Sequence, residues 1–345
     1  MRVVIVGNGN REKALYEHSQ YRCELYPLVP SQSSIQEMVH VINQFDPDLV
    51  VIGPEEPLVD GIVDLLPTHT VFGPTKAMAR LEGSKIYAHE ICDQLGIKTP
   101  KYYVPDNSND AEKAIQNFPN LLVVKADGLH KGKGVFVADT IEEALAVTIG
   151  MEEPYLLEER LFGQECSVTT LIGPTGDIHM LPTVRDYKRA FDGDAGLNTG
   201  GMGGYSPVPY IEPHLPAIRR NIIEPIVSKL SYVNAFLYVG IMLDSTGEIS
   251  VLEFNVRLGD PETQIMLPLL KHNLIDYIIG NEIPEFHDDM CSVGVVLTDP
   301  NYPTTGKRQK TVIGTGSTFR EARDAAYAQT LRFRTDIARE VVESQ

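Results

Sequence analysis

The sequence predicts an α/β protein that begins with a parallel sheet covered by helices. A short apolar run, Arg2–Val6, is followed by the glycine turn 7–9 and then by a helical stretch. A second apolar run at 48–52 follows the helical pattern of residues 34–45. Strands that alternate with helices are typical of parallel sheets, which bind ligands at the carboxyl ends of their strands.

Along the chain we expect five units. They are an N-terminal Rossmann-like domain (1–75), a linking helix (76–100), two units of strands and short helices (101–165 and 166–272) and a small C-terminal α/β domain (273–345). Residues 74–95 are predicted to form one long helix that ends at Gly96. The glycine-rich stretch 186–205 is predicted to be a long functional loop, because it lacks apolar periodicity. Strands are predicted at 121–126, 135–138, 236–243, 249–256, 291–298 and 311–315, and helices at 212–231, 263–280 and 318–330.

Composition and charge narrow the class of protein. The chain has 345 residues, of which 43% are apolar and 22% charged, and its formal net charge is −17. This acidity argues against a broad nucleic-acid-binding surface, although local lysines and arginines can still bind a small anion. The four cysteines are scattered, which favours free thiols in a reducing compartment. Because Met1-Arg2 leads directly into a strand and no apolar run approaches 18 residues, we expect a cytoplasmic protein with no membrane partner.

The stretch 251–262 carries the pattern around which the chemistry is organised. Alternation along a strand places Glu253, Asn255 and Arg257 on one face. A carboxylate and an amide oxygen side by side suit a hard cation such as Mg²⁺, and a guanidinium beside them can reach phosphate oxygens. The alternative interpretation is an edge strand with a solvated polar face.

A glycine- and lysine-rich loop indicates phosphate binding. Lys125 ends a strand, and the loop from Gly128 to Gly134, which contains Lys133, separates it from the returning strand. Backbone N–H groups and ammonium groups of such a loop can close over phosphates. It is not a P-loop, since a strand follows it. Lys85 is either another phosphate ligand or a solvated lysine.

Other polar residues stand at predicted strand ends and turns. Gly9 and Arg11 begin the first helix, where a phosphate or carboxylate can bind, but the third glycine of a dinucleotide site is absent. Glu55 lies at the carboxyl end of the 48–52 strand, as a functional residue or as a helix-start carboxylate. Residues 158–161 suit an adenine edge and Glu165 suits ribose hydroxyls, although alone they would be ordinary surface groups.

Several long motifs together resemble a known family. They are Gly53-Pro-Glu-Glu-Pro-Leu-Val, Leu81-Glu-Gly-Ser-Lys85, Val124-Lys-Ala-Asp-Gly-Leu, Asn198-Thr-Gly-Gly-Met-Gly203 and Glu253-Phe-Asn-Val-Arg-Leu-Gly-Asp-Pro-Glu-Thr-Gln264. The chain is similar to phosphoribosylamine–glycine ligase, the glycinamide ribonucleotide synthetase of purine biosynthesis, which is an ATP-grasp enzyme. The resemblance runs in order from residue 2 to about 270 and continues more weakly beyond.

The resemblance implies an ATP-grasp fold and an ATP-dependent ligation of glycine to 5-phosphoribosylamine, giving ADP and phosphate through glycyl phosphate. It implies ATP and Mg²⁺ or Mn²⁺ as cofactors, and a monomer or homodimer. The implied metal ligands are Glu253 and Asn255, and the implied catalytic residues are Arg257, Lys188 and Asp186. The implied ATP ligands are Lys85, Lys125, Gly128, Lys133, Gly134, Glu158, Glu159, Leu161 and Glu165. The implied substrate ligands are Gly9, Arg11, Glu55, Asn198, Gly200, Gly201, Asp260 and Glu262.

Two alternatives stay open at this point. The first is a paralogous ATP-grasp ligase that joins a small carboxylate to a different amine. It is motivated by the segment 10–31, which differs from the usual family pattern. The second is a nucleotide-binding regulatory protein without turnover, which the joint presence of Lys125, Glu253, Asn255 and Arg257 disfavours.

Overall fold

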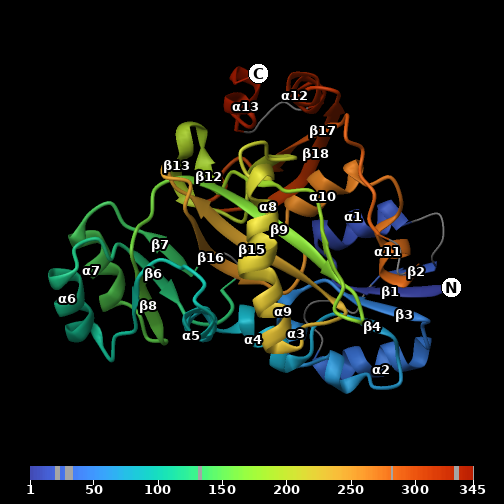
Figure 1. Cartoon of the computed structure of the whole chain (residues 1–345), viewed down its shortest axis with the longest axis horizontal. Coiled ribbons are helices and arrows are strands. Elements are labelled where there is room, and N and C mark those ends of the chain that lie inside the picture. The colour runs from blue at the N-terminus through green and yellow to red at the C-terminus, as the bar shows by residue number, and fades with distance from the viewer. Residues whose placement is uncertain (20–23, 28–33, 131–133, 281–282, 330–333, 345) are drawn as a thin grey trace.

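The computed structural model describes residues 1–19, 24–27, 34–130, 134–280, 283–329 and 334–344. Four sheets of four strands and one two-stranded ribbon make up its β structure within these ranges. Figure 1 shows a lid built from α6, α7 and β6–β8 on one side of the molecule and the N-terminal sheet on the other. The strands β9, β15 and β16 run between them, and the C-terminal helices lie above these strands.

The N-terminal sheet has the predicted parallel topology. Its order is β2 (Glu24–Pro27), β1 (Arg2–Val6), β3 (Leu49–Ile52) and β4 (Val71–Phe72), and each pair is parallel. Helices α1 (Asn10–Ser19), α2 (Ile35–Phe45) and α3 (Glu55–Asp60) connect these strands. Ser34 and Glu37 form a capping box at the start of α2, which fixes where that helix begins. β3 is buried throughout and β1 is buried from Val3 onward, so the turns that follow their carboxyl ends are where a ligand is expected.

The predicted single helix at 74–95 is wrong, because the chain forms two helices there. Helix α4 spans Lys76–Gly83 and α5 spans Lys85–Leu95, and Ser84 between them has an extended backbone with φ −146°. The Ser84 hydroxyl accepts a hydrogen bond from the N–H of Tyr87 and so caps α5. It also donates to the Asp127 carboxylate at 3.0 Å. Because Ser84 caps α5, two helices are favoured over one continuous helix. The hydrogen bond to Asp127 also connects this break to the lid.

The lid is an antiparallel sheet covered by two helices, as predicted for residues 121–138. Its order is β5 (Tyr102–Tyr103), β8 (Tyr155–Glu158), β6 (Val123–Ala126) and β7 (Val135–Val137). Helices α6 (Ser108–Asn117) and α7 (Ile141–Ile149) pack with these strands around a core of their own. The lid thus has a buried apolar cluster of its own, as expected for a subdomain.

The central sheet is antiparallel and forms the floor of the molecule between lid and N-terminal domain. Its order is β10 (Ile178–Met180), β9 (Gln164–Ile172), β15 (Ala235–Leu243) and β16 (Ile249–Asn255). Phe236 of β15 meets Phe72 of β4 edge to face, with ring centroids 4.8 Å apart. The N–H of Gly73 donates to the carbonyl of Asn234 at 2.9 Å. These contacts fix the central sheet to the N-terminal sheet.

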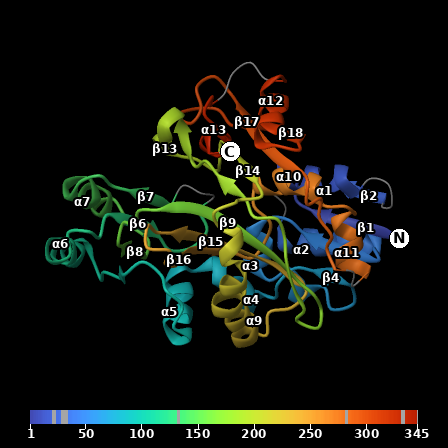
Figure 2. The same ribbon diagram turned by 45° about the horizontal axis from the view of Figure 1, so that its top comes forward.

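The predicted loop at 186–205 is wrong, because most of it forms short strands. β11 (Arg185–Asp186) and β14 (Gly203–Ser206) pair with each other, and β12 (Arg189–Phe191) pairs with β13 (Ala195–Asn198) as a small hairpin. β14 also pairs with β17 (Cys291–Thr298), and β17 with β18 (Arg308–Gly316). Glycine is required in β14, since Gly203 has φ +139° and a Cβ there would meet the Gly294 carbonyl. Figure 2 shows β14, β17 and β18 side by side, so residues on both sides of the expected boundary at 272–273 share one sheet.

The remaining predicted helices form with interruptions. Residues 212–230 are helical in four successive segments, of which α8 (Leu215–Ile218) and α9 (Glu224–Leu230) are α-helical. The expected helix at 263–280 consists of α10 (Glu262–Met266), a short 3₁₀ turn and α11 (Leu274–Gly280). Helix α12 (Phe319–Tyr327) and helix α13 (Arg339–Glu343) complete the described chain. Among the helices that the structure describes, none is both long and apolar enough to span a bilayer.

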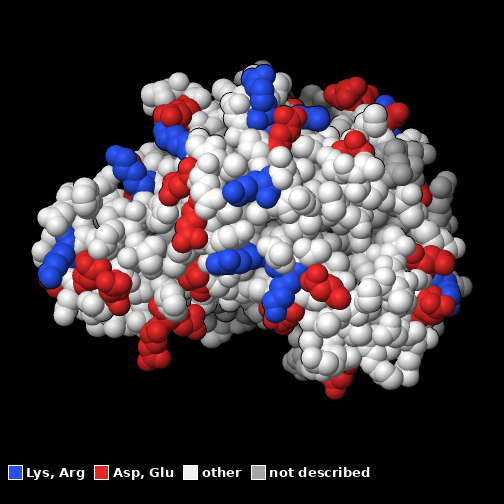
Figure 3. Space-filling model, turned by 60° about the horizontal axis from the view of Figure 1, so that its bottom comes forward, with Lys and Arg blue, Asp and Glu red and all other residues white. Residues whose placement is uncertain are grey.

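The face drawn in Figure 3 carries lysine and arginine interspersed with aspartate and glutamate. Neighbouring charges of opposite sign weaken each other's field. This face therefore has the mixed character expected of a protein that does not bind a polyanion along its surface.

Replacement of Phe72 by alanine tests the joint between the two sheets. Phe72 is 2% exposed, and its loss should lower the free energy of unfolding by about 3–5 kcal/mol through lost burial and the cavity left behind. Urea unfolding would measure this change. Phe118→Ala is the matched control, because Phe118 is 60% exposed and its truncation should change stability by less than about 0.5 kcal/mol. Equal effects of the two substitutions would contradict this assignment.

Candidate active site

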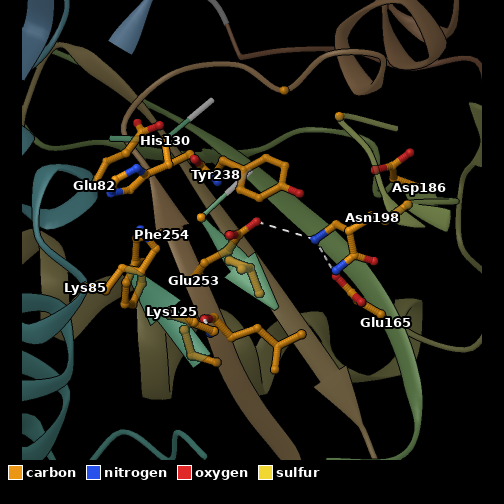
Figure 4. A pocket seen from close by; sticks show the side chains of 18 of the residues that line it. Glu82, Lys85, Lys125, His130, Glu165, Asp186, Asn198, Tyr238, Glu253 and Phe254 are labelled. Carbon is orange, nitrogen blue, oxygen red and sulfur yellow. Dashed lines mark hydrogen bonds and ion pairs between the residues drawn. The ribbon is translucent and has the colours of Figure 1, made fainter. Parts of the chain in front are cut away.

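A cavity of about 740 Å³ lies where the lid, the central sheet, the N-terminal turns and the 185–206 region meet. Its walls carry an unusual number of charged side chains from segments far apart in the sequence. In Figure 4, Lys85 and Lys125 lie on one side of the cavity, Glu165 and Asp186 on the other, and Glu253 between them.

Lys188 joins two carboxylates across this cavity. Its Nζ lies 2.5 Å from Oε1 of Glu165 on β9 and 3.5 Å from Oε1 of Glu253 on β16. Lys188 lowers the pKa of Glu253 to about 2, against the opposing effect of burial, and Lys125 and Lys85 add to the lowering. Burial opposes the charge of Lys188, but Glu165 and Glu253 raise its pKa above the ordinary value. Glu253 is therefore ionised and Lys188 protonated at neutral pH.

The strand pattern of 253–257 has the predicted orientation in part. Glu253, Asn255 and Arg257 all line the cavity, whereas of the two alternate residues Val256 is buried away from it and Phe254, although buried, also lines it. The Arg257 guanidinium donates to Oδ1 of Asn255 at 3.1 Å, so these two side chains are held together.

Arg257 is also held by two glutamates that come from the N-terminal part of the chain. Its Nη2 lies 2.9 Å from Oε1 of Glu82 on α4, and its Nε lies 3.2 Å from Oε2 of Glu55 on α3. The other Glu82 oxygen accepts the N–H of Val256 at 2.7 Å. Burial nevertheless raises the pKa of Glu82 to about 7. Helix α4 thus fixes both the strand end and the guanidinium.

The two predicted phosphate lysines meet at the base of the lid. Lys85 Nζ donates to the carbonyls of Ala126 and Gly128, each at 2.9 Å. Lys125 Nζ donates to the Leu252 carbonyl at 2.9 Å and pairs with Glu158 at 2.7 Å. Burial lowers the pKa of Lys85, and the nearby Lys125 adds to this effect. Two neighbouring ammonium groups can attract a polyanionic ligand, although Glu158 pairs with Lys125 and the charge of Glu253 acts on Lys85.

Glu158, at the end of β8, is a buried carboxylate with two partners. Besides Lys125, it contacts Nε2 of His89 at 2.9 Å. Burial raises the pKa of Glu158, but Lys125 and His89 outweigh that effect and lower it. Beyond it, Glu159 and Leu161 turn past the cavity wall toward β9. The N–H groups of Glu159 and Arg160 donate to the carbonyls of Lys101 and Asn120, and the adenine role of this strand end stays a prediction.

A pair of carboxyl groups lies opposite the lysines. Glu262, at the start of α10, is buried and accepts the hydroxyl of Tyr238 at 2.9 Å. Burial and the charge of Glu262 raise the pKa of Asp186, and burial raises the pKa of Glu262. Oδ1 of Asp186 is buried without a hydrogen-bond partner among the described residues. Two carboxyl groups in this state can bind a cationic amino group or hold a proton.

Arg308 of β18 fixes the glycine segment, Gly200 and Gly201, to Asp260. It contacts the carbonyl of Gly200 and donates to the carbonyl and the carboxylate of Asp260, both at 2.9 Å. A Cβ at Gly200 would collide with this guanidinium, which explains the glycine. The Gly201 carbonyl also accepts from Arg308, at 3.3 Å.

The turn after β1 contributes the remaining side chains. Arg11 donates to Oε1 of Glu12 at 2.7 Å and to the Leu258 carbonyl at 2.9 Å, and its Nη2 lies 3.8 Å from Glu55. The N–H of Gly9 donates to Glu12 at 2.6 Å. Arg11 thereby reaches the same carboxylate, Glu55, that Arg257 contacts.

The structure brings almost all of the predicted site residues to one cavity. Of the residues that the resemblance implies, Gly201 follows the cavity-lining Gly200 but does not itself line the cavity. Lys133 lies outside the described residues. So does the part 28–31 of the segment 10–31, which motivated the alternative of a paralogous ligase. The following line the cavity: Gly9, Arg11, Glu55, Lys85, Lys125, Gly128, Gly134, Glu158, Glu159, Leu161, Glu165, Asp186, Lys188, Asn198, Gly200, Glu253, Asn255, Arg257, Asp260 and Glu262. Their individual roles stay predictions.

Sequence reasoning missed Glu82, His89, Tyr238 and Arg308. Glu82 stands within the Leu81-Glu-Gly-Ser-Lys85 motif, which could have identified it as a site residue. Its contact with Arg257 could not be predicted from the sequence. His89 and Tyr238 occur in helix and strand patterns that resemble ordinary core positions. Arg308 lies in a stretch with no recognisable motif, and only the pairing of β17 with β18 brings it to the site.

The donor set fits a divalent cation in part. The ionised Glu253 and the amide oxygen of Asn255 are hard oxygen ligands side by side. No group of three or more His, Cys, Asp or Glu side chains among the described residues could hold a metal ion by itself. Mg²⁺ commonly takes one or two protein oxygens and completes its coordination with substrate phosphates, and this arrangement suits that mode.

Three features together define the class of protein. A lid subdomain, a central antiparallel sheet and a charged cavity between them are the architecture of an ATP-grasp enzyme. Residues 83–263 match the family described as phosphoribosylglycinamide synthetase, ATP-grasp (A) domain, and residues 1–82 match its N domain. The chain belongs to the phosphoribosylglycinamide synthetase family.

Individual relatives agree with this family. The chain is 35% identical over 352 residues to the phosphoribosylamine–glycine ligase of Ralstonia nicotianae, covering 91% of this chain and 83% of that protein. It is 36% identical over 360 residues to the trifunctional purine biosynthetic protein adenosine-3 of Chironomus tentans, covering 91% of this chain but only 26% of that protein. The crystal structure of the Thermotoga maritima phosphoribosylamine–glycine ligase superimposes with a TM-score of 0.82 at 31% identity, over 98% of this chain and 100% of that one.

The low pKa of Glu253 predicts how stability depends on pH. A carboxyl whose pKa falls from 4.5 in the unfolded chain to about 2 stabilises the folded protein above pH 4.5, and this contribution is lost as the pH falls toward 2. Between about pH 5 and pH 3, the free energy of unfolding should therefore fall more for the wild type than for Glu253→Gln. Urea unfolding at several pH values measures this. The exposed Glu152→Gln should behave like the wild type, and parallel curves for all three proteins would contradict the interpretation.

Proposed function

We propose that this protein ligates glycine to 5-phosphoribosylamine with hydrolysis of ATP to ADP and phosphate. The observation that carries the proposal is the convergence of Lys85, Lys125, Lys188 and Arg257 on one cavity that also holds the ionised Glu253. Phosphoryl transfer depends on cationic groups placed around the transferring phosphate more than on a protein nucleophile. The family supports the choice of substrates, since several relatives carry the name phosphoribosylamine–glycine ligase.

The first step activates the amino acid. A carboxylate oxygen of glycine forms a bond to the γ-phosphorus of ATP while the bond to ADP breaks, which gives glycyl phosphate. Lys85 and Lys125 bind phosphate oxygens, and Arg257, held by Glu82 and Asn255, neutralises the charge that develops on the phosphoryl group. The carboxyl pair Asp186 and Glu262 lies where the glycine ammonium can be bound.

The second step transfers the glycyl group. The amine nitrogen of phosphoribosylamine bonds to the acyl carbon, the carbon–oxygen bond to phosphate breaks, and the amine loses a proton. Arg11 is placed to bind the phosphate of this substrate, because it stands on the N-terminal turn beside the cavity. Glu55 lies between Arg11 and Arg257 and so separates the two substrate regions.

The metal, the location and the assembly belong to the same proposal. Glu253 and Asn255 would hold Mg²⁺, or Mn²⁺ in its place, and the bound cation would neutralise phosphate charge during transfer. We place the enzyme in the cytoplasm, in agreement with the free thiols of Cys92, Cys166 and Cys291. We expect a monomer or a homodimer that binds small molecules.

The decisive experiment measures ADP release with ATP and Mg²⁺, with glycine and phosphoribosylamine each present or omitted, the amine being generated in the same tube. ADP release that requires both substrates, with formation of the amide product by mass spectrometry, is the expected result. ADP release with glycine alone, or with a different amine, would instead favour the paralogous ligase. Absence of any ADP release together with ATP binding would favour the regulatory protein.

Arg11→Ala separates the amine region from the ATP region. The substitution should raise the KM for phosphoribosylamine at least tenfold, because it removes a charged hydrogen-bond donor to phosphate, which is worth about 1.5–3 kcal/mol. The KM for ATP should change by less than about twofold, since Arg11 stands on α1 whereas Lys85 and Lys125 stand on α5 and β6. Steady-state kinetics with each substrate varied in turn measures both values. Equal increases in both would indicate a folding role for Arg11.

A further inference from the structure

One side chain outside the cavity contacts the chain on both sides of Lys188. Arg334 Nη1 donates to the carbonyl of Arg189 at 2.9 Å, and its guanidinium carbon lies 4.8 Å from the ring centroid of Tyr187. Tyr187 and Arg189 are the immediate neighbours of Lys188 in the sequence. Arg334 itself lines no part of the cavity.

Arg334 is rigidly held where it makes these contacts. Its side chain is 1% exposed, and its Nε lies 2.6 Å from Oδ1 of Asp336. Its Nη2 pairs with Asp194 at 2.6 Å and with Oδ2 of Asp336 at 3.0 Å. A planar guanidinium with two carboxylates and a carbonyl in fixed directions has little freedom to move.

Further bonds tie the same segment to the β12–β13 hairpin. The N–H of Thr335 donates to Asp192 at 2.7 Å, and the N–H of Gly193 donates to Asp336 at 2.8 Å. The hydroxyl of Tyr187 contacts Glu340 and accepts the N–H of Ala338 at 3.0 Å. Residues 334–340 therefore clasp the hairpin, and we call them the clasp.

The hairpin transmits this restraint to the cavity. The N–H and the hydroxyl of Thr199 both donate to the Lys188 carbonyl, at 2.8 and 2.9 Å, which fixes the backbone of Lys188 from the opposite side. With its backbone held, the Lys188 side chain spans the gap to Glu165 and Glu253. The hairpin strands expose Phe191 (55%) and Leu197 (64%), so burial of these side chains does not hold the hairpin in place.

We propose that Arg334 is a positioning residue that fixes Lys188 against Glu165 and Glu253 by holding Tyr187 and Arg189. The inference rests on the proposed function only in so far as Lys188 takes part in turnover. The clasp thus makes residues after β18 necessary for the geometry of a side chain in the central domain.

Arg334→Lys tests this in a double-mutant cycle with Lys188→Met. Lysine keeps the charge but loses the planar fork and the contact with the ring. We expect kcat to fall about tenfold and the KM for ATP to stay within about twofold, because misplacement of a catalytic group affects the reaction step. In the Lys188→Met background the same substitution should lower the residual kcat by less than about twofold. The exposed Arg320→Lys on α12 is the matched control and should leave kcat unchanged.

A merely structural role predicts a different pattern. Arg334→Lys would then lower kcat by the same factor in both backgrounds, or would lower only the melting temperature, and either result overturns the proposal. If Arg334→Lys is unfolded at the assay temperature, Asp336→Asn replaces it, since that change weakens the fork while keeping its shape. An unchanged kcat in the folded Arg334→Lys protein also overturns it.

A second measurement does not depend on turnover. Acetic anhydride modifies deprotonated amines, so a lysine held between two carboxylates reacts slowly. Mass spectrometry of labelled protein should show Lys188 reacting at least about threefold faster in Arg334→Lys, with exposed Lys113 unchanged. A faster reaction in a protein without ligase activity would leave the positioning role intact and overturn only the proposed function. An unchanged reaction of Lys188 would overturn the positioning role, whatever the activity.

Discussion

The ion pairs of Lys188 with Glu165 and Glu253 are the interaction on which the site depends. A cavity that collects many charges in a partly water-excluded space is stable only if each charge has an opposite partner nearby. Lys188 provides that partner for two carboxylates at once. It also keeps Glu253 ionised, as a carboxylate ligand for a cation must be. The arrangement is therefore preorganised before any ligand arrives, as an electrostatic site must be.

The same requirement explains why the chain is built from several sheets around one cavity. Lys188 comes from the region of short strands, Glu165 and Glu253 from the central sheet, and Lys125 from the lid. One sheet edge can place only a few side chains around a ligand. Charged side chains can therefore surround a triphosphate only if several elements contribute them from different directions. The lid strands and helices share a small core of their own, and Lys125 connects this part to the Leu252 carbonyl of the central sheet.

The parts of the structure that follow local chemistry were predictable from the sequence. The parallel start of the chain, the lid strands around the glycine–lysine loop and the alternation at Glu253, Asn255 and Arg257 all rest on short-range patterns. The break at Ser84 was not predicted, because a serine within an amphipathic pattern is compatible with a continuous helix. The sequence alone does not show that its hydroxyl caps a second helix. The strands within 186–205 were missed for another reason. Their pairing partners, β17 among them, lie far away in the sequence, and a glycine-rich strand carries no periodic apolar signal. Arg308 and Arg334 reach the region of the site only through this distant pairing.

The pairing of β14 with β17 has a consequence for synthesis of the chain on the ribosome. After β14 has been synthesised, the edge that pairs with β17 has no partner until residues 291–298 have been translated. During that interval the central sheet can fold, but Arg308 and the glycine segment have no fixed positions, so the nascent chain cannot carry out ligation. An unpaired strand edge is also prone to associate with other chains. A strand as short as Gly203–Ser206, half of it glycine, offers a poor template for such association.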